Sequence, residues 1–156
     1  MIKIRLVAVG KVKEKYYAEA IAEYKKRLSR FCDYEIIEVR EENYEKFTAG
    51  DIPKILAIEG GRIFEAVKGY AIALAVEGEK YSSTEFADLI SKLAASGKSE
   101  ITFIIGGSYG IDERIKSAAK KISFSDMTFP HTLMRVVFTE QLYRAFTIIN
   151  NTEYHK

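Results

Sequence analysis

The sequence predicts an α/β protein with a largely parallel sheet, because short apolar runs alternate along it with segments of helical periodicity. Two of these runs, residues 70–76 and 101–105, are almost unbroken in apolar residues, which is typical of strands covered on both faces. The length of 156 residues suits one domain spanning 1–156, and no linker, repeat or low-complexity tract interrupts it.

The first half of the chain predicts two strands and two helices. A strand over residues 2–9 ends at Gly10, and apolar residues at helical spacing predict a helix over 16–28 that carries its lysines on the opposite side. A second strand is expected over 34–39. Asp51 and Pro53 begin the next helix, since aspartate caps a helix and proline suits its first turn. The pair Gly60-Gly61 is expected to weaken that helix midway.

The second half continues the alternation and ends on an unusual helix. Residues 82–85 form a capping box that begins an amphipathic helix after the strand at 70–76. The strand at 101–105 is followed by a helix over about 112–121 and a short run at 122–124. A small domain rarely encloses its last helix, so a second subunit is the natural cover for a final helix that is apolar on almost every side. That helix spans about 131–150 and carries Leu133, Met134, Val136, Val137 and Phe138.

Composition excludes several classes of protein. Hydrophobic residues make up 47% and charged residues 29%, as in soluble globular proteins, and no apolar run approaches the ~20 residues that span a bilayer. The charged N-terminus lacks the pattern of a signal peptide, so a cytoplasmic protein is expected. Cys32 is the single cysteine, which excludes an internal disulfide and a cysteine-based zinc site, and two isolated histidines suggest no other metal centre.

Charge is unevenly distributed along the chain, although the net charge is only +2. Residues 1–30 contain nine lysines and arginines against three glutamates, whereas residues 33–45 contain six acids against Arg40 alone. This segregation fits a basic face for a polyanionic partner, and it fits an ordinary solvated helix surface even better. Charge alone does not decide between the two.

Three strand ends carry unusual sequences, at residues 74–78, 104–110 and 124–131. In open parallel sheets, ligands bind beyond the carboxyl ends of the strands. The glycines at 106, 107 and 110 allow the backbone to approach a ligand closely. Neither the G-x-G-x-x-G pattern of dinucleotide-binding folds nor the Gly-Lys-Ser/Thr of phosphate-binding loops is present. A tight turn between strand and helix is the competing interpretation.

Several motifs occur in order along the chain. They are Val9-Gly10-Lys11-x-Lys13-Glu14-x-Tyr16, Gly106-Gly107-Ser108-x-Gly110, the segments 123–131, 134–137 and 140–146, and the terminal Tyr154-His155-Lys156. Together they closely resemble the ribosomal RNA large subunit methyltransferase H family. The resemblance covers essentially the whole chain and is specific, because several long motifs share one order and spacing.

The resemblance implies a SPOUT α/β-knot fold, in which a parallel sheet is flanked by helices and the C-terminal part forms a trefoil knot. It implies S-adenosylmethionine as cofactor, a homodimer with its active site at the interface, and methylation of nitrogen 3 of a pseudouridine in helix 69 of 23S rRNA within the ribosome. Position 126 varies in the family, so its backbone and not its side chain is expected to contact the cofactor. The family resemblance does not explain the acidic segment 33–45. The cofactor residues implied are Leu74, Gly106, Phe124, Ser125, Asp126, Met127, Thr128 and Phe129.

Candidate catalytic residues lie near the C-terminus. The target nitrogen must lose a proton before its lone pair attacks the methyl group, so positioning and charge stabilisation can supply much of the catalysis. Arg144 is the candidate for stabilising charge or holding a phosphate, His155 for accepting the proton, and Tyr154 for stacking on or hydrogen-bonding the base. The tail is expected to cross to the partner's cofactor pocket. Plainer interpretations are that Glu140 and Arg144 form an intrahelical ion pair, and that His131 is a helix-start residue tied to the backbone.

Two other functions compete with methyl transfer. A ribosome-associated RNA-binding factor without catalysis would use the basic N-terminal third, but it leaves the glycine turn and the C-terminal polar cluster unexplained. A Rossmann-type nucleotide-binding enzyme would need a nucleotide fingerprint, which the sequence lacks. Saturable binding of S-adenosylmethionine would distinguish a methyltransferase from these two alternatives.

Overall fold

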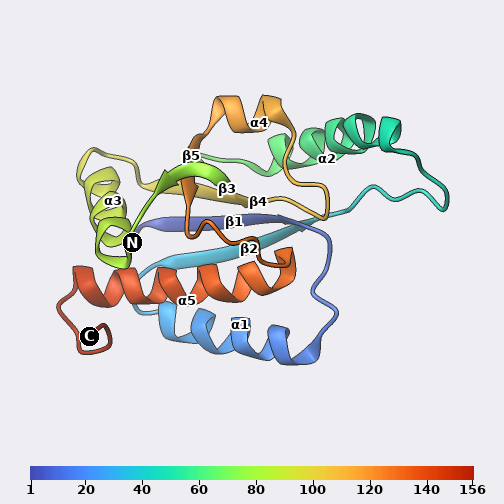
Figure 1. Cartoon of the computed structure of the whole chain (residues 1–156). Coiled ribbons are helices and arrows are strands. Elements are labelled where there is room, and N and C mark those ends of the chain that lie inside the picture. The colour runs from blue at the N-terminus through green and yellow to red at the C-terminus, as the bar shows by residue number, and fades with distance from the viewer.

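A computed structural model describes all of residues 1–156 and shows a five-stranded parallel sheet between two layers of helices (Figure 1). The predicted α/β class, with a parallel sheet flanked by helices, is confirmed. The strands are β1 (Lys3–Val9), β2 (Asp33–Val39), β3 (Tyr70–Lys80), β4 (Glu100–Ile105) and β5 (Lys120–Ser123). The helices are α1 (Lys15–Leu28), α2 (Ile52–Ala66), α3 (Ser83–Ala95), α4 (Glu113–Ala118) and α5 (His131–Ile149), and a 3-10 turn η1 (Ala49–Asp51) precedes α2.

The strand order is β2-β1-β4-β3-β5, which places β4 at the centre of the sheet. Helices α1, α3 and α5 pack together on one face, and α2 and α4 cover the other (Figure 1). Side chains of β1 alternate between the two sides: Ile4 and Leu6 belong to the larger apolar cluster, and Val7 and Val9 to the smaller one. None of the helices combines the length and the apolar character that crossing a membrane requires.

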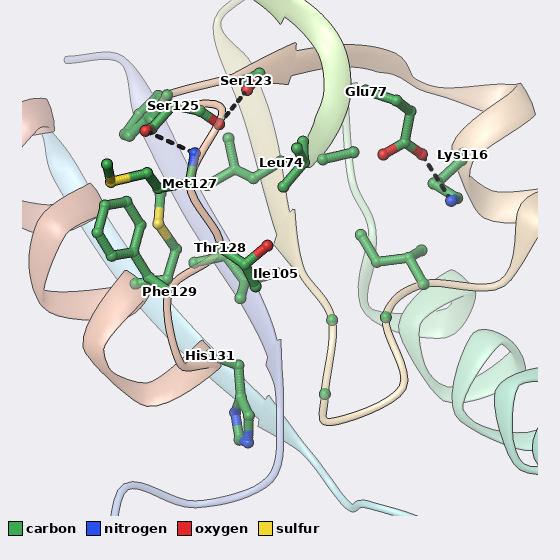
Figure 2. A pocket seen from close by; sticks show the side chains of 18 residues that line it. Leu74, Glu77, Ile105, Lys116, Ser123, Ser125, Met127, Thr128, Phe129 and His131 are labelled. Atoms are coloured by element: carbon green, nitrogen blue, oxygen red, sulfur yellow. Dashed lines mark hydrogen bonds and ion pairs between the residues drawn. The ribbon is translucent and has the colours of Figure 1, made fainter.

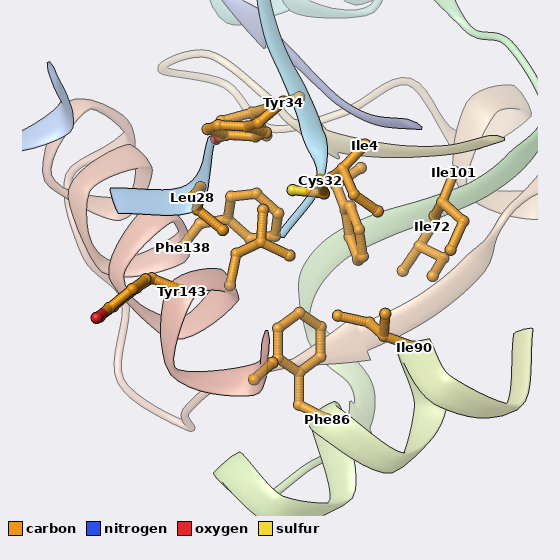
Figure 3. Packing of buried hydrophobic residues seen from close by; sticks show 14 of the residues in the cluster. Ile4, Leu28, Cys32, Tyr34, Ile72, Phe86, Ile90, Ile101, Phe138 and Tyr143 are labelled. Atoms are coloured by element: carbon orange, nitrogen blue, oxygen red, sulfur yellow. The ribbon is translucent and has the colours of Figure 1, made fainter. Parts of the chain in front are cut away.

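The larger apolar cluster anchors α5 to the sheet (Figure 3). The ring of Phe138 lies 4.8 Å from that of Phe103 of β4 and 6.2 Å from that of Phe124, measured between centroids. Phe86 of α3 packs on the same group, edge-on to Phe124 at 5.2 Å. This aromatic core holds the start of the segment between β5 and α5 in place, and that segment forms part of the site described below.

Helix α2 runs unbroken through Gly60 and Gly61, so the expected weakening at this pair does not interrupt the helix. Ile55 and Ile63, both 1% exposed, hold the helix on the sheet, and such packing outweighs a low intrinsic helix propensity. Gly60 has a packing role, because a Cβ there would stand 2.8 Å from a carboxylate oxygen of Asp112. Gly61 faces open space.

The segment from β3 to β5 differs most from expectation. Strand β3 continues to Lys80, four residues past the predicted apolar run, and its pairing with β5 shifts register between Leu74 and Glu79. The backbone of residue 78 passes so close to Ile122 that a Cβ would lie 2.7 Å from its backbone atoms, which only glycine permits. Helix α4 is shorter than predicted, because residues 120–123 join the sheet as β5.

The acidic segment 33–45 forms ion pairs with arginines from elsewhere in the chain. Glu35 pairs with Arg5 at 2.9 Å, and Glu42 with Arg62 at 2.8 Å. A third pair, at 2.9 Å, joins Glu38 to Arg135, whose side chain is 1% exposed. The segment therefore serves to fasten β1, α2 and α5 to the strand β2 and the loop that follows it.

Candidate functional site

A cavity of about 260 Å³ opens beside residues 74–77 of β3 and beyond the carboxyl ends of β4 and β5 (Figure 2). Its walls come from the three segments that the sequence singles out: residues 74–77, the glycine turn after β4, and the loop between β5 and α5. Half of the lining residues are hydrophobic. Seven of the eight residues predicted to bind the cofactor line it, namely Leu74, Gly106, Phe124, Ser125, Met127, Thr128 and Phe129.

The glycine turn presents bare backbone to the cavity. A Cβ on Gly106 would overlap the carbonyl group of Gly110 across the turn. Gly110 has φ +90°, a conformation that side chains other than glycine rarely adopt, and its amide donates a hydrogen bond to the carbonyl of Gly107 at 3.1 Å. The turn is thus compact because it lacks side chains, and the same feature lets a ligand approach its backbone.

Short hydrogen bonds shape the loop between β5 and α5. The hydroxyl of Ser123 donates to the carbonyl of Ser125 at 2.9 Å, and the amide of Met127 donates to the hydroxyl of Ser125 at 3.0 Å (Figure 2). The side chain of Asp126 does not line the cavity, since its carboxylate pairs with Lys80 at 2.7 Å. Asp126 is therefore the one predicted cofactor residue that does not line the cavity.

The cavity wall also contains an ion pair that the sequence did not indicate. Glu77 accepts a hydrogen bond from Lys116 of α4 at 2.8 Å (Figure 2). Lys116 also pairs with Glu113 at 2.8 Å. The hydrogen bond from Lys116 lowers the pKa of Glu77, and the bonds to Glu113 and then Glu77 raise the pKa of Lys116. Both side chains are charged at neutral pH. The sequence analysis singled out the segment 74–78, which contains Glu77. Lys116 belongs to no motif, and only the folded structure places it in the cavity wall.

His131, the first residue of α5, lines the cavity at the end away from Glu77 and Lys116 (Figure 2). Its Nδ1 atom is buried and has no hydrogen-bond partner, so the expectation that the ring is tied to the backbone is wrong. Burial is the largest cause that lowers its pKa, and Arg135 one turn later adds to it. The ring is therefore neutral at pH 7.

The three predicted catalytic residues meet one another at the other end of α5. Arg144 pairs with Glu140 at 2.6 Å, and one of its guanidinium nitrogens lies 3.2 Å from Nδ1 of His155. Its guanidinium carbon stands 4.7 Å above the ring of Tyr154, whose hydroxyl donates to Glu140 at 2.9 Å. The predicted ion pair between Glu140 and Arg144 is present, and it is one part of a larger cluster that also ties down the tail.

The two groups of predicted site residues lie at opposite ends of one helix. His131 is at the cavity, and Arg144 follows more than three turns later, so a rise of 1.5 Å per residue separates them by roughly 20 Å. A single chain therefore does not bring Arg144, Tyr154 and His155 to its own cavity.

Helix α5 exposes an apolar stripe between these two ends. Leu133, Val136 and Val137 are partly exposed and belong to neither apolar cluster of the chain. Positions 133, 137, 140 and 144 are three or four residues apart, so Val137 shares a face with Glu140 and Arg144. The sequence predicted a helix apolar all round. The structure places one side in the core and leaves this stripe without a partner.

Comparisons with known proteins find similar sequences over nearly the whole chain. A family profile described as "Predicted SPOUT methyltransferase" matches residues 2–155. Ribosomal RNA large subunit methyltransferase H of Limosilactobacillus reuteri is 48% identical over 99% of this chain and 100% of its own length. The protein of the same name from Streptococcus uberis is 49% identical over the same shares of both chains.

Solved structures with low sequence identity share the fold. A Haemophilus influenzae structure described as a "probable methylase family protein" superposes with a TM-score of 0.57 at 14% identity, covering 98% of this chain and 70% of that chain. A Neisseria gonorrhoeae structure described as a "putative methylase family protein" gives 0.56 at 12% identity, with coverage of 98% and 85%. At such identities the likeness concerns the path of the backbone.

Proposed function

The chain belongs to the ribosomal RNA large subunit methyltransferase H family, within the SPOUT methyltransferases, and on that premise we propose that it transfers a methyl group from S-adenosylmethionine to ribosomal RNA of the large subunit. The observation that carries the proposal is the cavity at the sheet edge. The segments that the family resemblance assigns to the cofactor, around Leu74, Gly106 and 124–129, come from three separate parts of the chain and converge on it.

The residues around the cavity suit this cofactor. Its hydrophobic wall can take a flat adenine ring, and the bare backbone at Gly106 offers hydrogen-bonding groups that no side chain shields. Glu77 and Lys116 place an acceptor and a donor at one end, which match hydroxyl and carboxylate groups. When bound, S-adenosylmethionine supplies the methyl group from its sulfonium. The chain binds it, orients it and excludes water from it.

We propose nitrogen 3 of a pseudouridine in helix 69 of 23S rRNA as the methylated atom, as the family resemblance implies, in ribosomes in the cytoplasm. That atom is an imide nitrogen, so the protein must help to remove its proton and must hold the base in line. Lys11 and Lys13 are exposed on the loop after β1, close to the His131 end of the cavity, and offer positive charge to a phosphate backbone.

A homodimer is part of the proposal, because a two-fold dimer buries the same patch on both copies. Val137 lies midway between His131 and Arg144 in sequence. If two α5 helices pack antiparallel through their apolar stripes at Val137, Arg144 of one copy lies at the same height along the helix pair as His131 of the other. The tail, which is fastened to Arg144, then reaches the partner's cavity.

In this arrangement the C-terminal residues complete the site of the other copy. Arg144 carries the positive charge that stabilises the developing imide anion or holds a phosphate, with Glu140 fixing its orientation. Burial, with the hydrogen bond to Glu140, raises the pKa of Tyr154, so its hydroxyl stays protonated and acts as a donor or a stacking surface for the base. His155 completes the set as a further polar group at the target base.

We extend the proposal to the path of the chain. Members of the SPOUT group carry a trefoil knot at the cofactor site, and in such a knot two contacts of this chain would hold the knotted strands together. The backbone at residue 78 touches that of Lys121 and Ile122, and the amide of Tyr81 donates to the carbonyl of Ser123 at 3.3 Å. The strand before the C-terminal segment is thus pressed closely against the far end of β3.

Methyl transfer to ribosomes from a strain lacking this modification tests the proposal. The purified protein with labelled S-adenosylmethionine is expected to label 23S rRNA at one nucleotide, which primer extension or mass spectrometry locates. Calorimetry with S-adenosylmethionine alone is the companion measurement. A non-catalytic RNA-binding factor would bind ribosomes and give no saturable heat with the cofactor, and that result would overturn the proposal.

A further inference from the structure

Buried polar groups without hydrogen-bond partners gather around the carboxyl end of β1. Four buried side-chain atoms in the chain have no partner, and they belong to Glu14, Glu59, His131 and Arg135. Arg135 donates to the carbonyl of Val9, and a Cβ on Gly107 would meet both Val9 and Glu59, so these groups surround one end of the cavity. Native proteins leave few such atoms, and each one calls for a reason.

His131 lines the cavity, and its two ring nitrogens differ in their surroundings. Nδ1 is buried and without a partner, which leaves Nε2 as the nitrogen that can exchange a proton with a bound base. Three charged groups act on the pKa of the ring: Arg135 on its own helix, Glu14 at the start of α1, and Glu41 after β2. Burial and Arg135 lower the pKa, whereas Glu41 and Glu14 raise it. The two carboxylates favour the protonated ring, so a neutral ring here can take up a proton and hold it.

Glu14 is oriented unusually for its position. It is the N-cap residue of α1, where a carboxylate commonly accepts hydrogen bonds from the first backbone amides of the helix, yet its side chain makes no cap bond. Its Oε2 atom is buried and unpartnered instead. A carboxylate that makes no bond to its own helix, and whose charge raises the pKa of His131, is suited to accept a hydrogen bond from Nδ1–H, which leaves the proton-accepting lone pair on Nε2.

His155, the other histidine of the chain, is not free to act in the same way. Arginine has donors only, so Nδ1 of His155 must be the acceptor in its 3.2 Å contact with Arg144. The proton of the neutral ring then sits on Nε2, and neither nitrogen has a free lone pair while that contact lasts.

We propose that His131 accepts the proton of the target nitrogen and that Glu14 is the positioning residue that holds its tautomer. The inference rests on the proposed function and names a residue pair within that site. The N–H bond of the base breaks and its proton passes to Nε2 of His131. The new N–CH3 bond forms as the S–CH3 bond breaks, with that electron pair remaining on sulfur, and His131 later releases the proton to water. Catalytic hydrogen bonds often form only when substrate binds, which suits two buried groups that are not yet bonded to each other.

The first test needs no cofactor. An NMR titration follows the His131 imidazole in the wild-type protein, in Glu14→Gln and in Glu19→Gln, the last being an exposed glutamate on the same helix that serves as a control. Because Glu14 raises the pKa of His131, Glu14→Gln is expected to lower that pKa, and Glu19→Gln to leave it unchanged. If Glu14→Gln does not move the His131 titration, the assigned pair is wrong.

The second test is single-turnover methyl transfer to ribosomes as a function of pH. His131→Gln is expected to lose ~10²-fold or more at pH 7, with cofactor binding by calorimetry and thermal unfolding nearly unchanged. The loss should shrink in alkaline solution, where the imide gives up its proton unaided. A loss of equal size at every pH, or no loss, would overturn the role of His131. Failure of the proposed function is seen separately, as a wild-type protein that methylates no ribosome at any pH.

Discussion

The guanidinium of Arg135 donates a hydrogen bond to the carboxylate of Glu38 at 2.9 Å, in an ion pair that joins α5 to the end of β2. The same guanidinium donates to the carbonyl of Val9 at 2.6 Å. Because Arg135 is 1% exposed, its charge is almost wholly removed from water, and its partners must compensate for that. The contact fixes the N-terminal half of α5, and with it His131, beside the cavity.

Removal of Glu38 should therefore destabilise the fold much more than removal of Glu35. Glu38→Ala leaves a buried arginine without its counter-charge, which costs about 3 kcal/mol of unfolding free energy. Glu35→Ala, on the same strand, breaks a pair that is half exposed on the glutamate side, and the cost is under about 1 kcal/mol. Denaturant unfolding at one protein concentration measures both. Equal losses would show that the burial of Arg135 contributes nothing.

Replacing Gly106 should abolish cofactor binding without unfolding the protein. A Cβ at this position overlaps the carbonyl of Gly110, so Gly106→Ala forces the turn to move and displaces the backbone that faces the cavity. Gly61→Ala is the matched control, since a Cβ there meets nothing within 4 Å and alanine favours the helix. Calorimetry with S-adenosylmethionine should show binding only for the control. Near-normal affinity in Gly106→Ala would mean that the cofactor lies elsewhere.

Glu59 should make the stability of the protein depend on pH. Burial raises its pKa above the ordinary value, and one of its oxygens has no partner. A raised carboxyl pKa means that its contribution to stability is complete below the unfolded pKa of about 4.3 and is lost as the pH rises through the folded value. Relative to Glu59→Gln, the wild-type protein should thus lose stability as the pH rises from about 4.3 through the raised pKa of Glu59. Unfolding curves at several pH values check this, and a constant difference would contradict it.

The parts of the fold that follow from local pattern were predicted from the sequence. Each strand and helix has its own periodicity, and the capping box at Ser82 is present as expected, with its hydroxyl accepting from the amide of Glu85 at 3.2 Å. The three segments around the cavity were found because parallel strands all end at one edge of the sheet, so their distance in sequence does not matter.

What the sequence did not predict depends on contacts between distant residues. The burial of Gly60 under Asp112, the pairing of Glu38 with Arg135 and the presence of Lys116 in the cavity wall all require the elements to be assembled first. His131 was assigned to a plain structural role because a lone histidine at a helix start usually has one. Only its unpartnered Nδ1 beside the cavity distinguishes it.

The apolar stripe on α5 should control dimer formation. If a two-fold axis passes near Val137, Val137→Glu brings two carboxylates together in each dimer and should yield monomers, and Val137→Lys should do the same with two ammonium groups. Mixing the two variants pairs opposite charges and should restore a dimer. Phe64→Glu, on the exposed side of α2, is the control and should leave the mass unchanged. Light scattering follows all four, and a wild-type monomer at micromolar concentration would exclude the proposed dimer.

The tail should act on the cavity of the partner subunit. Within one chain, Tyr154 and His155 are fastened to Arg144, roughly 20 Å along α5 from the cavity, so they have no reach to their own cofactor. Deleting residues 154–156 should leave dimerisation and cofactor binding nearly unchanged, because neither the stripe on α5 nor the cavity wall is altered. Methyl transfer should fall by ~10²-fold or more, as expected for a lost positioning or acid–base group.

Mixing two inactive proteins then shows which subunit the tail serves. A Gly106→Ala chain keeps its tail but lacks a sound cavity, and a tail-deleted chain has the reverse defect. If the tail acts in trans, each heterodimer contains one complete site, built from the second chain's cavity and the first chain's tail. Random exchange makes half of the dimers heterodimers with one active site of two, so about a quarter of the wild-type activity should return. If the tail acts in cis, no site in the mixture is complete. Activity that stays absent after mass spectrometry has verified the heterodimers would therefore refute the crossing of the tail.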